Sequence, residues 1–158
     1  MIYIWTDGAC LPRNPGPGGA AWVIKTSATF KSGKRAYKHT TNNRMELMAV
    51  ILALCEVRSG YEVTIYSDSQ YFTKAVNLAW LSKWKRNDWK TSEKKKVKNV
   101  DLWKEIDRLF QEHPAVHVEW IPRLSCAGQR EADELANDAA TSKEIKRWTD
   151  TQYEKTPT

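Results

Sequence analysis

The stretch TTNNRMELMAVILAL, residues 40–54, predicts the first helix of the chain and sets the class of fold. Asn43 is a favourable N-cap, and Glu46 follows it by three residues, as in a capping box. The apolar side chains recur at helical spacing, at Met45, Met48, Ala49, Leu52 and Ala53. Gly60 is expected to end the helix. The segments on either side should supply the strands on which this helix packs.

Three segments rich in β-branched and aromatic residues precede the helix. They are Ile2–Thr6, Ala20–Lys25 and about residues 30–39. A loop rich in proline and glycine, residues 12–19, separates the first two, and turn signals such as Ser27 follow. This order predicts an antiparallel meander.

Strands and helices alternate after the first helix. We expect a strand at residues 63–68, a helix at 69–79, a helix at 101–110, a strand at 116–121 and a helix at 131–140. The result is a mixed sheet with helices on its faces. The sequence shows no internal repeat or second domain. We therefore predict one domain over residues 1–145 and a flexible polar tail over residues 146–158.

The composition is that of a soluble globular domain. The chain has 158 residues, enough to bury a core without disulfides. No apolar run approaches the roughly 20 residues of a membrane helix, and the N-terminus lacks the basic region of a signal peptide. Cys10, Cys55 and Cys126 are far apart, which indicates a reducing compartment, the cytoplasm. Cys55 lies in an apolar run and is expected in the core.

One segment holds the whole excess of positive charge. The chain has a net charge of +6, from 25 Lys and Arg against 19 Asp and Glu. Residues 83–98 contain eight of these cations and two acids, Asp88 and Glu93, so the rest of the chain balances at 17 against 17. Such a patch predicts a polyanionic partner. The alternative is a solvated, lysine-rich loop.

Four carboxylates stand at positions where sites gather. Asp7 and Asp68 end predicted strands, and Glu46 and Asp133 begin predicted helices. A crowded carboxylate cluster is costly unless cations neutralise it, and all-oxygen ligands favour Mg²⁺ or Mn²⁺. Two such ions can activate water and stabilise the leaving oxygen of a phosphodiester. Taken singly, each acid could instead be a turn, capping or surface residue, and spacing alone leaves both interpretations open.

Longer strings resemble a known family. IWTDGACLPRNPGPGGAAWVI, TTNNRMELMAVILAL, YSDSQY, WLSKWKRNDWKTSEKKKVKNVDLW and EADELANDAA occur in this order, and together they resemble type 1 ribonuclease H of the bacterial kind. The resemblance implies a five-stranded sheet with parallel fourth and fifth strands, helices on both faces and a basic helical handle at about residues 80–100. It also implies endonucleolytic, metal-dependent hydrolysis of the RNA strand of RNA–DNA hybrids, leaving 5′-phosphate and 3′-hydroxyl ends. Asp7, Glu46, Asp68 and Asp133 match the family's metal-binding carboxylates.

The resemblance further implies where the hybrid binds. The residues that match groove positions are Cys10, Asn14, Asn42, Asn43 and Gln70, and Thr41 matches a contact to a DNA phosphate. Small amides can read 2′-hydroxyls and base edges in a minor groove. Asn43 could instead be only a helix cap, and Cys10 only a loop residue.

The handle interleaves aromatic and basic residues. Trp80 and Trp84 are four residues apart and share a helix face, and Lys85, Arg86 and Trp89 follow. Aromatic faces beside cations suit a sugar–phosphate backbone. We predict that at least one of these tryptophans meets the DNA strand while others pack the handle, and that Trp103 is structural.

The chain departs from the family in one loop. The segment WIPRLSCAGQREAD lacks the family's histidine, and none of the three histidines of the chain matches its position. We hypothesise that the loop serves product release less well, or that Arg123 or Arg130 partly substitutes by holding a phosphate. A DNA-acting nuclease of the same fold and a catalytically weak hybrid-binding protein remain alternatives. We expect a monomer, because no heptad or extra dimerising element is present.

Overall fold

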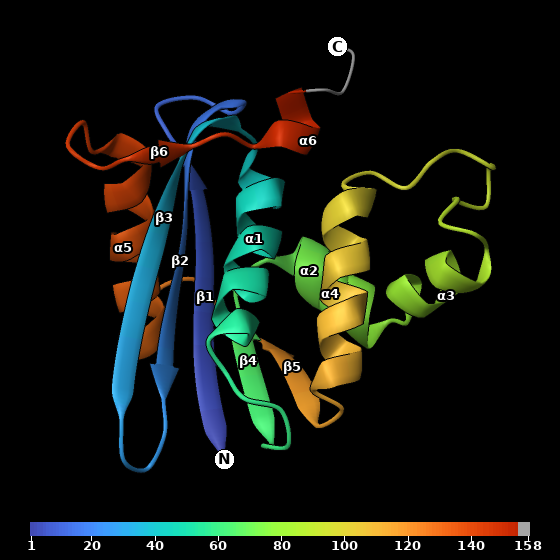
Figure 1. Cartoon of the computed structure of the whole chain (residues 1–158), viewed down its shortest axis with the longest axis horizontal. Helices are drawn as coiled ribbons and strands as arrows, with labels where there is room; N and C mark the ends of the chain where they lie inside the picture. Colours follow the sequence, from blue (N-terminus) through green and yellow to red (C-terminus); the bar gives the residue numbers. More distant parts are fainter. Residues whose placement is uncertain (155–158) are drawn as a thin grey trace.

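The computed structural model describes residues 1–154, which form a six-stranded sheet with helices on both faces (Figure 1). The strand order is β5-β4-β1-β2-β3-β6. The strands are β1 Ile2–Cys10, β2 Gly16–Lys25, β3 Phe30–Thr40, β4 Val63–Ser67, β5 Val116–Trp120 and β6 Arg147–Trp148. The five predicted strands are all present. The sixth, β6, has two residues and is too short to give an alternating pattern.

The sheet is mixed, as predicted. β1, β2 and β3 form an antiparallel meander, whereas β4 pairs parallel to β1 and β5 parallel to β4. In the β1–β4 register Thr6 lies opposite Ser67. Asp7 and Asp68 are the next residues of these two parallel strands, so the topology alone brings them side by side.

Two layers of helices cover the sheet (Figure 1). The helices are α1 Asn42–Cys55, α2 Gln70–Asn77, α3 Trp80–Arg86, α4 Val100–Glu112, α5 Ala127–Thr141 and α6 Thr151–Glu154. α5 packs on β1 and β2, while α1 packs on the same strands from the other face and against α4. α3 and the loop after it extend away from the sheet as a handle. No helix of residues 1–154 is long and apolar enough to cross a membrane.

The start of α1 differs from the capping prediction. Thr41, not Asn43, is the N-cap, and its hydroxyl accepts from the Arg44 backbone N–H at 3.2 Å. Because Asn43 is already inside the helix, the capping-box role of Glu46 is wrong, and that side chain is free to serve another purpose.

The end of α1 also differs from the prediction. The helix stops at Cys55 rather than near Gly60. Cys55 is exposed, so its predicted burial is wrong. Each residue turns about 100° around a helix, which carries Cys55 away from the face that buries Ala53 and Leu54.

The main core lies between the sheet and helices α1, α2 and α4. Ile4, Leu47, Phe72 and Trp103 are fully buried in it. The indole N–H of Trp103 donates to the Tyr71 hydroxyl at 3.0 Å, and the Trp103 ring stacks on Phe72 with centroids 6.4 Å apart. The structural role predicted for Trp103 is confirmed.

The segment predicted to be a flexible tail packs against the sheet through residue 154. β6 pairs with Ala36 and Tyr37 of β3, and Asp150 is only 4% exposed. The carboxylate of Asp150 accepts from Arg44 Nε at 2.7 Å. A polar composition predicts exposure, but here the buried cation of Arg44 supplies a partner. Residues 155–158 of the predicted tail lie outside the described residues.

Candidate active site

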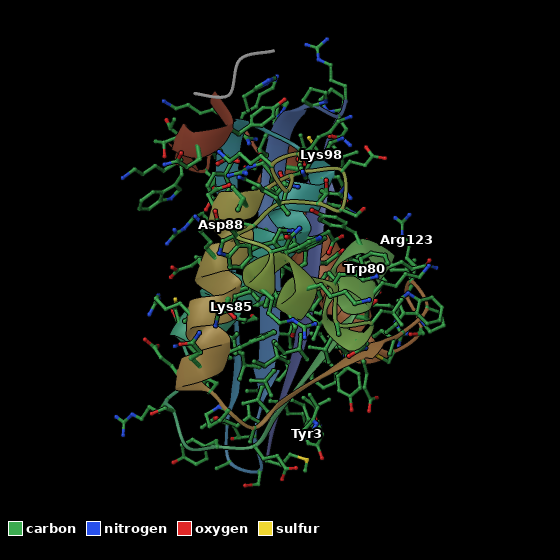
Figure 2. The ribbon with its side chains drawn as sticks, turned by 90° about the vertical axis from the view of Figure 1, so that its right-hand side faces the viewer. Tyr3, Trp80, Lys85, Asp88, Lys98 and Arg123 are labelled. Carbon is green, nitrogen blue, oxygen red and sulfur yellow. The ribbon has the colours of Figure 1, made fainter. Side chains whose placement is uncertain are left out.

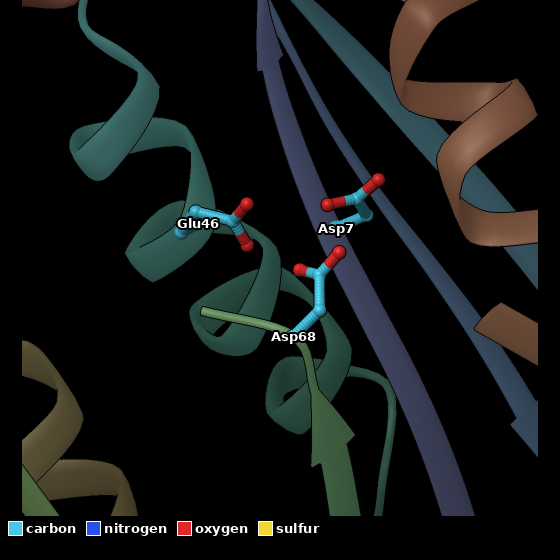
Figure 3. Close-up of side chains that lie close together, drawn as sticks. All are labelled: Asp7, Glu46 and Asp68. Atoms are coloured by element: carbon cyan, nitrogen blue, oxygen red, sulfur yellow. The ribbon is translucent and has the colours of Figure 1, made fainter. Parts of the chain in front are cut away.

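Three carboxylates meet where β4 ends beside β1 and α1 (Figure 3). Asp7 comes from β1, Asp68 directly follows β4, and Glu46 lies on α1. One ligand oxygen from each lies within 4.8 Å of the other two. Figure 3 shows the three side chains pointing toward one another from these elements. This spacing suits a shared cation.

The close approach of α1 to β1 requires glycine at position 8. A Cβ on Gly8 would lie 2.4 Å from the Glu46 backbone nitrogen and 2.5 Å from the Met45 carbonyl carbon. Gly8 lies within the strand rather than in a turn. The Asp7-Gly8 pair therefore places one carboxylate and opens the space for Glu46 to come alongside it.

The cluster is electrostatically strained without a cation. Burial and the nearby charge of Asp68 raise the pKa of Asp7 to about 8. Burial and the charge of Asp7 hold the pKa of Glu46 well above its ordinary value, and burial raises the pKa of Asp68 despite the nearby Arg123. Glu46 Oε2 is buried and has no hydrogen-bond partner among the described residues. An orphaned carboxylate oxygen among like charges is the environment that a divalent cation would satisfy.

Asp133 lies near this cluster but outside the tight group of three. It belongs to α5, and its charge contributes to the raised pKa of both Asp7 and Asp68. Asn137 Nδ2 donates to Asp133 Oδ2 at 3.2 Å, and Arg123 Nη2 lies 3.6 Å from Asp133 Oδ1. All four carboxylates line one open cleft of about 530 Å³.

Two residues that the sequence did not single out hold Asp68. Gln129 is fully buried; its Nε2 donates to Asp68 Oδ2 at 3.1 Å, and its Oε1 accepts from the Leu124 backbone N–H at 2.6 Å. The indole of Trp120 donates to the Asp68 backbone carbonyl at 3.1 Å. The signal for Gln129 is its position four residues before Asp133, one helical turn away.

The predicted groove residues occupy two adjoining clefts. Cys10, Asn42, Asn43 and Gln70 line the carboxylate cleft. Asn14 and Thr41, together with the two asparagines, line a neighbouring cleft of about 730 Å³.

Two of these residues also have structural contacts. Asn14 Oδ1 accepts from the Asn42 backbone N–H at 3.1 Å and ties the two loops together. Cys10 is buried, and its thiol donates to the carbonyl of Arg13 at 3.2 Å. Cys10 thus has the loop-packing role that the sequence left open, while it also borders the cleft.

The handle divides its tryptophans between packing and exposure. Trp84 and Trp89 are half-buried against the core, whereas Trp80 is 36% exposed (Figure 2). Lys104 lies over the Trp89 ring at 5.9 Å from its centroid. Lys85 pairs with Asp107 at 3.0 Å, which ties the handle to α4. Arg86 is exposed in the last turn of α3.

The two arginines of the altered loop have different surroundings. Arg123 lines the carboxylate cleft and is exposed (Figure 2). Arg130 Nη1 donates to the Leu124 carbonyl at 3.3 Å and braces the loop. Of the two, Arg123 is the one placed to meet a substrate phosphate.

Sequence comparisons agree with this geometry. A family model described as RNase H matches residues 1–141. The ribonuclease H of Edwardsiella ictaluri (strain 93-146) is 46% identical over 143 residues, which cover 89% of this chain and 90% of that protein. The ribonuclease H of Rhodopseudomonas palustris (strain BisB5) is 44% identical over 146 residues, which cover 92% and 95%.

Solved structures agree as well. LC9-RNase H1, described as a type 1 RNase H with the type 2 active-site motif, superposes with a TM-score of 0.75 at 26% identity, over 88% of this chain and 71% of that one. LC11-RNase H1, solved in complex with an RNA/DNA hybrid, gives a TM-score of 0.69 at 26% identity, over 89% and 96%.

Proposed function

This chain belongs to the ribonuclease H family and is an endonuclease that hydrolyses RNA in RNA–DNA hybrids, and we propose that Asp7, Glu46, Asp68 and Asp133 carry the reaction. The observation that carries this assignment is the buried group of Asp7, Glu46 and Asp68, with oxygens within 4.8 Å of one another and an orphaned oxygen on Glu46. Among the described residues, Arg123 is the one cation found near these acids.

We propose Mg²⁺ as the physiological ion, with Mn²⁺ as a substitute and two ions bound with substrate. The support is an all-oxygen donor set that converges from three elements. When bound, the ions would supply an activated water and stabilise the leaving 3′ oxygen, giving 5′-phosphate and 3′-hydroxyl products. Asp7, Glu46 and Asp68 would hold these ions, with Asp133 lining the same cleft from α5.

Arg123 is our candidate for the role of the missing loop histidine. Its guanidinium lies 3.6 Å from Asp133 and borders the cleft, so it can hold a non-bridging phosphate oxygen while substrate enters or product leaves. Arg123→Ala and Arg130→Ala form a matched pair. We expect the first to lower kcat about tenfold and the second to change it much less. Equal and unchanged turnover in both variants would contradict this role.

Hybrid recognition would use the two adjoining clefts. We propose that Cys10, Asn14, Asn42, Asn43 and Gln70 meet the minor groove, where amides can read 2′-hydroxyls, and that Thr41 meets a DNA phosphate. We propose that the handle residues Trp80, Trp84, Lys85, Arg86 and Trp89 meet the DNA backbone. Trp80 has the exposure for direct contact, whereas Trp84 and Trp89 would act through their exposed edges. We further propose a cytoplasmic monomer with a domain over residues 1–145, on whose sheet the following segment with β6 and Asp150 docks.

A substrate panel tests the function. Labelled RNA–DNA hybrid, duplex DNA and duplex RNA are each incubated with Mg²⁺, with Mn²⁺ and with chelator. We expect cleavage of the RNA strand of the hybrid alone, and only with metal. Cleavage of duplex DNA but not hybrid would indicate a DNA-acting nuclease, and hybrid binding without cleavage would indicate a binding protein. Near wild-type cleavage by Asp7→Asn would disprove the proposed site.

A further inference from the structure

A second groove adjoins the carboxylate cleft on the side of α2 and β5. It has a volume of about 440 Å³ and lies between the outer face of α2 and the end of β5. Its lining residues are Gln70, Thr73, Lys74, Asn77, Leu78 and Trp120. Gln70 and Trp120 line both this groove and the carboxylate cleft. The groove is therefore a continuation of the cleft.

Trp120 is the fixed wall of this groove. Its side chain is 48% exposed, yet its indole N–H donates to the Asp68 carbonyl at 3.1 Å. That bond fixes the plane of the ring, so its exposed face is available without an ordering cost on binding. A tryptophan that uses its polar group internally and leaves its ring in solvent suits an amphipathic ligand.

The groove also offers a cation. Lys74 lies in the last turn of α2, is exposed, and forms no ion pair among residues 1–154 that would neutralise it. A lysine there also complements the carbonyl end of the helix, but that does not explain the exposed indole that lines the same groove. A cation and an aromatic ring in one groove match the alternation of phosphate and sugar in a nucleic-acid backbone.

We propose that this groove binds the sugar–phosphate backbone of the RNA strand where it leaves the cleft, with a ribose against Trp120 and a phosphate at Lys74. This inference rests on the proposed function, because the strand held at the carboxylates is RNA. The handle stands on α3 and the loop after it, so the groove is a separate contact, continuous with the cleft through Gln70 and Trp120. It lengthens the footprint of the enzyme on the strand that it cuts.

Hybrids of different lengths test the proposal. Steady-state cleavage is measured on a long hybrid and on hybrids trimmed stepwise from either RNA end. For Trp120→Ala we expect KM on the long hybrid to rise about tenfold, and the difference from wild type to shrink as one end, and not the other, is trimmed. Trp120→Phe keeps an aromatic face and removes the N–H donor, so it should restore most of the affinity. Trp148→Ala removes a tryptophan of similar exposure, 45%, at a distant strand and should behave as wild type.

The lysine gives an independent readout. Lys74→Gln should lower the salt dependence of hybrid binding by about one phosphate contact, whereas loss of helix stability alone would leave that slope unchanged.

The outcomes separate the groove from the proposed function. If wild type fails to cut any hybrid, the proposed function is wrong. If wild type cuts but the KM of Trp120→Ala rises by the same factor on hybrids of all lengths, Trp120 acts only by positioning Asp68, and the groove proposal fails. Wild-type KM in Trp120→Ala on the long hybrid would also overturn it.

Discussion

Helix α1 carries two buried ionic clusters that differ in how their charges are compensated. Glu46 faces Asp7 and Asp68, a group of like charges with one orphaned oxygen. Two residues earlier, Arg44 is only 3% exposed and faces acids of opposite charge. Glu46 and Arg44 lie on one helix and are both buried, so the sign of the charges around them is what distinguishes the two clusters.

The Arg44 cluster is fully satisfied. Its guanidinium makes a bidentate pair with Asp101, at 2.8 and 2.7 Å, and donates to both carboxylate oxygens of Asp150, at 2.7 and 2.9 Å. Thr40 Oγ1 also donates to Asp150 at 2.7 Å. Although burial alone would raise it, the hydrogen bonds from Arg44 lower the pKa of Asp101, the opposite of the direction at Asp7. Compensated charge marks a cluster that stabilises the fold, and uncompensated charge marks a place that a bound cation would neutralise.

The largest expected effect is on the rate at which the hybrid is cleaved. Glu46→Gln should lower kcat/KM on a hybrid by about a thousandfold or more, because it removes a ligand charge from the metal site. The same variant should unfold no more easily than wild type in chelator, since it relieves repulsion among buried acids. Activity assays and urea unfolding with chelator check the two halves. A destabilised Glu46→Gln that retained activity would reverse our assignment of the cluster.

The matching change in the other cluster should act on stability. Arg44→Ala leaves Asp101 and Asp150 without their cation, and we expect a loss of about 3–5 kcal/mol in the free energy of unfolding. Urea denaturation measures it. Arg44→Lys is the matched control and should recover part of the loss, because a single ammonium cannot reproduce the bidentate pair. A loss below about 1 kcal/mol for Arg44→Ala would mean that the Arg44 cluster does not stabilise the fold appreciably.

A smaller effect is expected at Gln129, which connects Asp68 in the carboxylate cleft to the loop at Leu124. Gln129→Leu removes the donor to Asp68 and the acceptor for Leu124 while keeping the volume similar. We expect activity or metal affinity to fall about tenfold, as for other partners of metal ligands. Gln129→Glu should also impair the site, by placing a further acid beside Asp68. A metal titration followed by activity checks both, and wild-type metal affinity in both variants would show that the loop alone holds Asp68 in place.

The sequence predicted the features of the two clusters that depend on the order of strands and helices along the chain. Asp7 and Asp68 come together because each follows a paired residue, Thr6 or Ser67, of the parallel strands β1 and β4. The sequence placed both acids at strand ends, but β1 continues past Asp7 to Cys10. Glu46 was predicted as a metal-binding carboxylate, and only its alternative role in a capping box is wrong, because the N-cap is Thr41 and not Asn43.

The parts that were missed depend on tertiary contacts. Arg44 gave no signal, since its partners lie 57 and 106 residues away along the chain. The docking of the segment around Asp150 was also missed, because the two-residue strand β6 has no periodicity and the partner of Asp150, Arg44, is distant in the chain. Gln129 offered only its spacing from Asp133, and the contact of Trp120 with Asp68 required the folded arrangement of β4 and β5.

The smallest expected effect, counted per unit of pH, is on the dependence of stability on pH, and the two clusters should differ in its sign. Because the pKa of Asp7 is raised to about 8, the metal-free folded state holds a proton that the unfolded chain releases above its ordinary value of 3.8. Stability should therefore fall as pH rises from about 4 to 8. Asp101 has a lowered pKa, so its contribution is present above 3.8 and is lost as pH falls through its folded pKa. Urea unfolding in chelator should show the first slope reduced by about 1 kcal/mol per pH unit in Asp7→Asn. The loss of stability at acid pH should be smaller in Asp101→Asn than in wild type. Mg²⁺ should reduce the fall in stability between pH 4 and 8, because it favours the ionised carboxylates. It should not change the stability that the Arg44 cluster loses at acid pH.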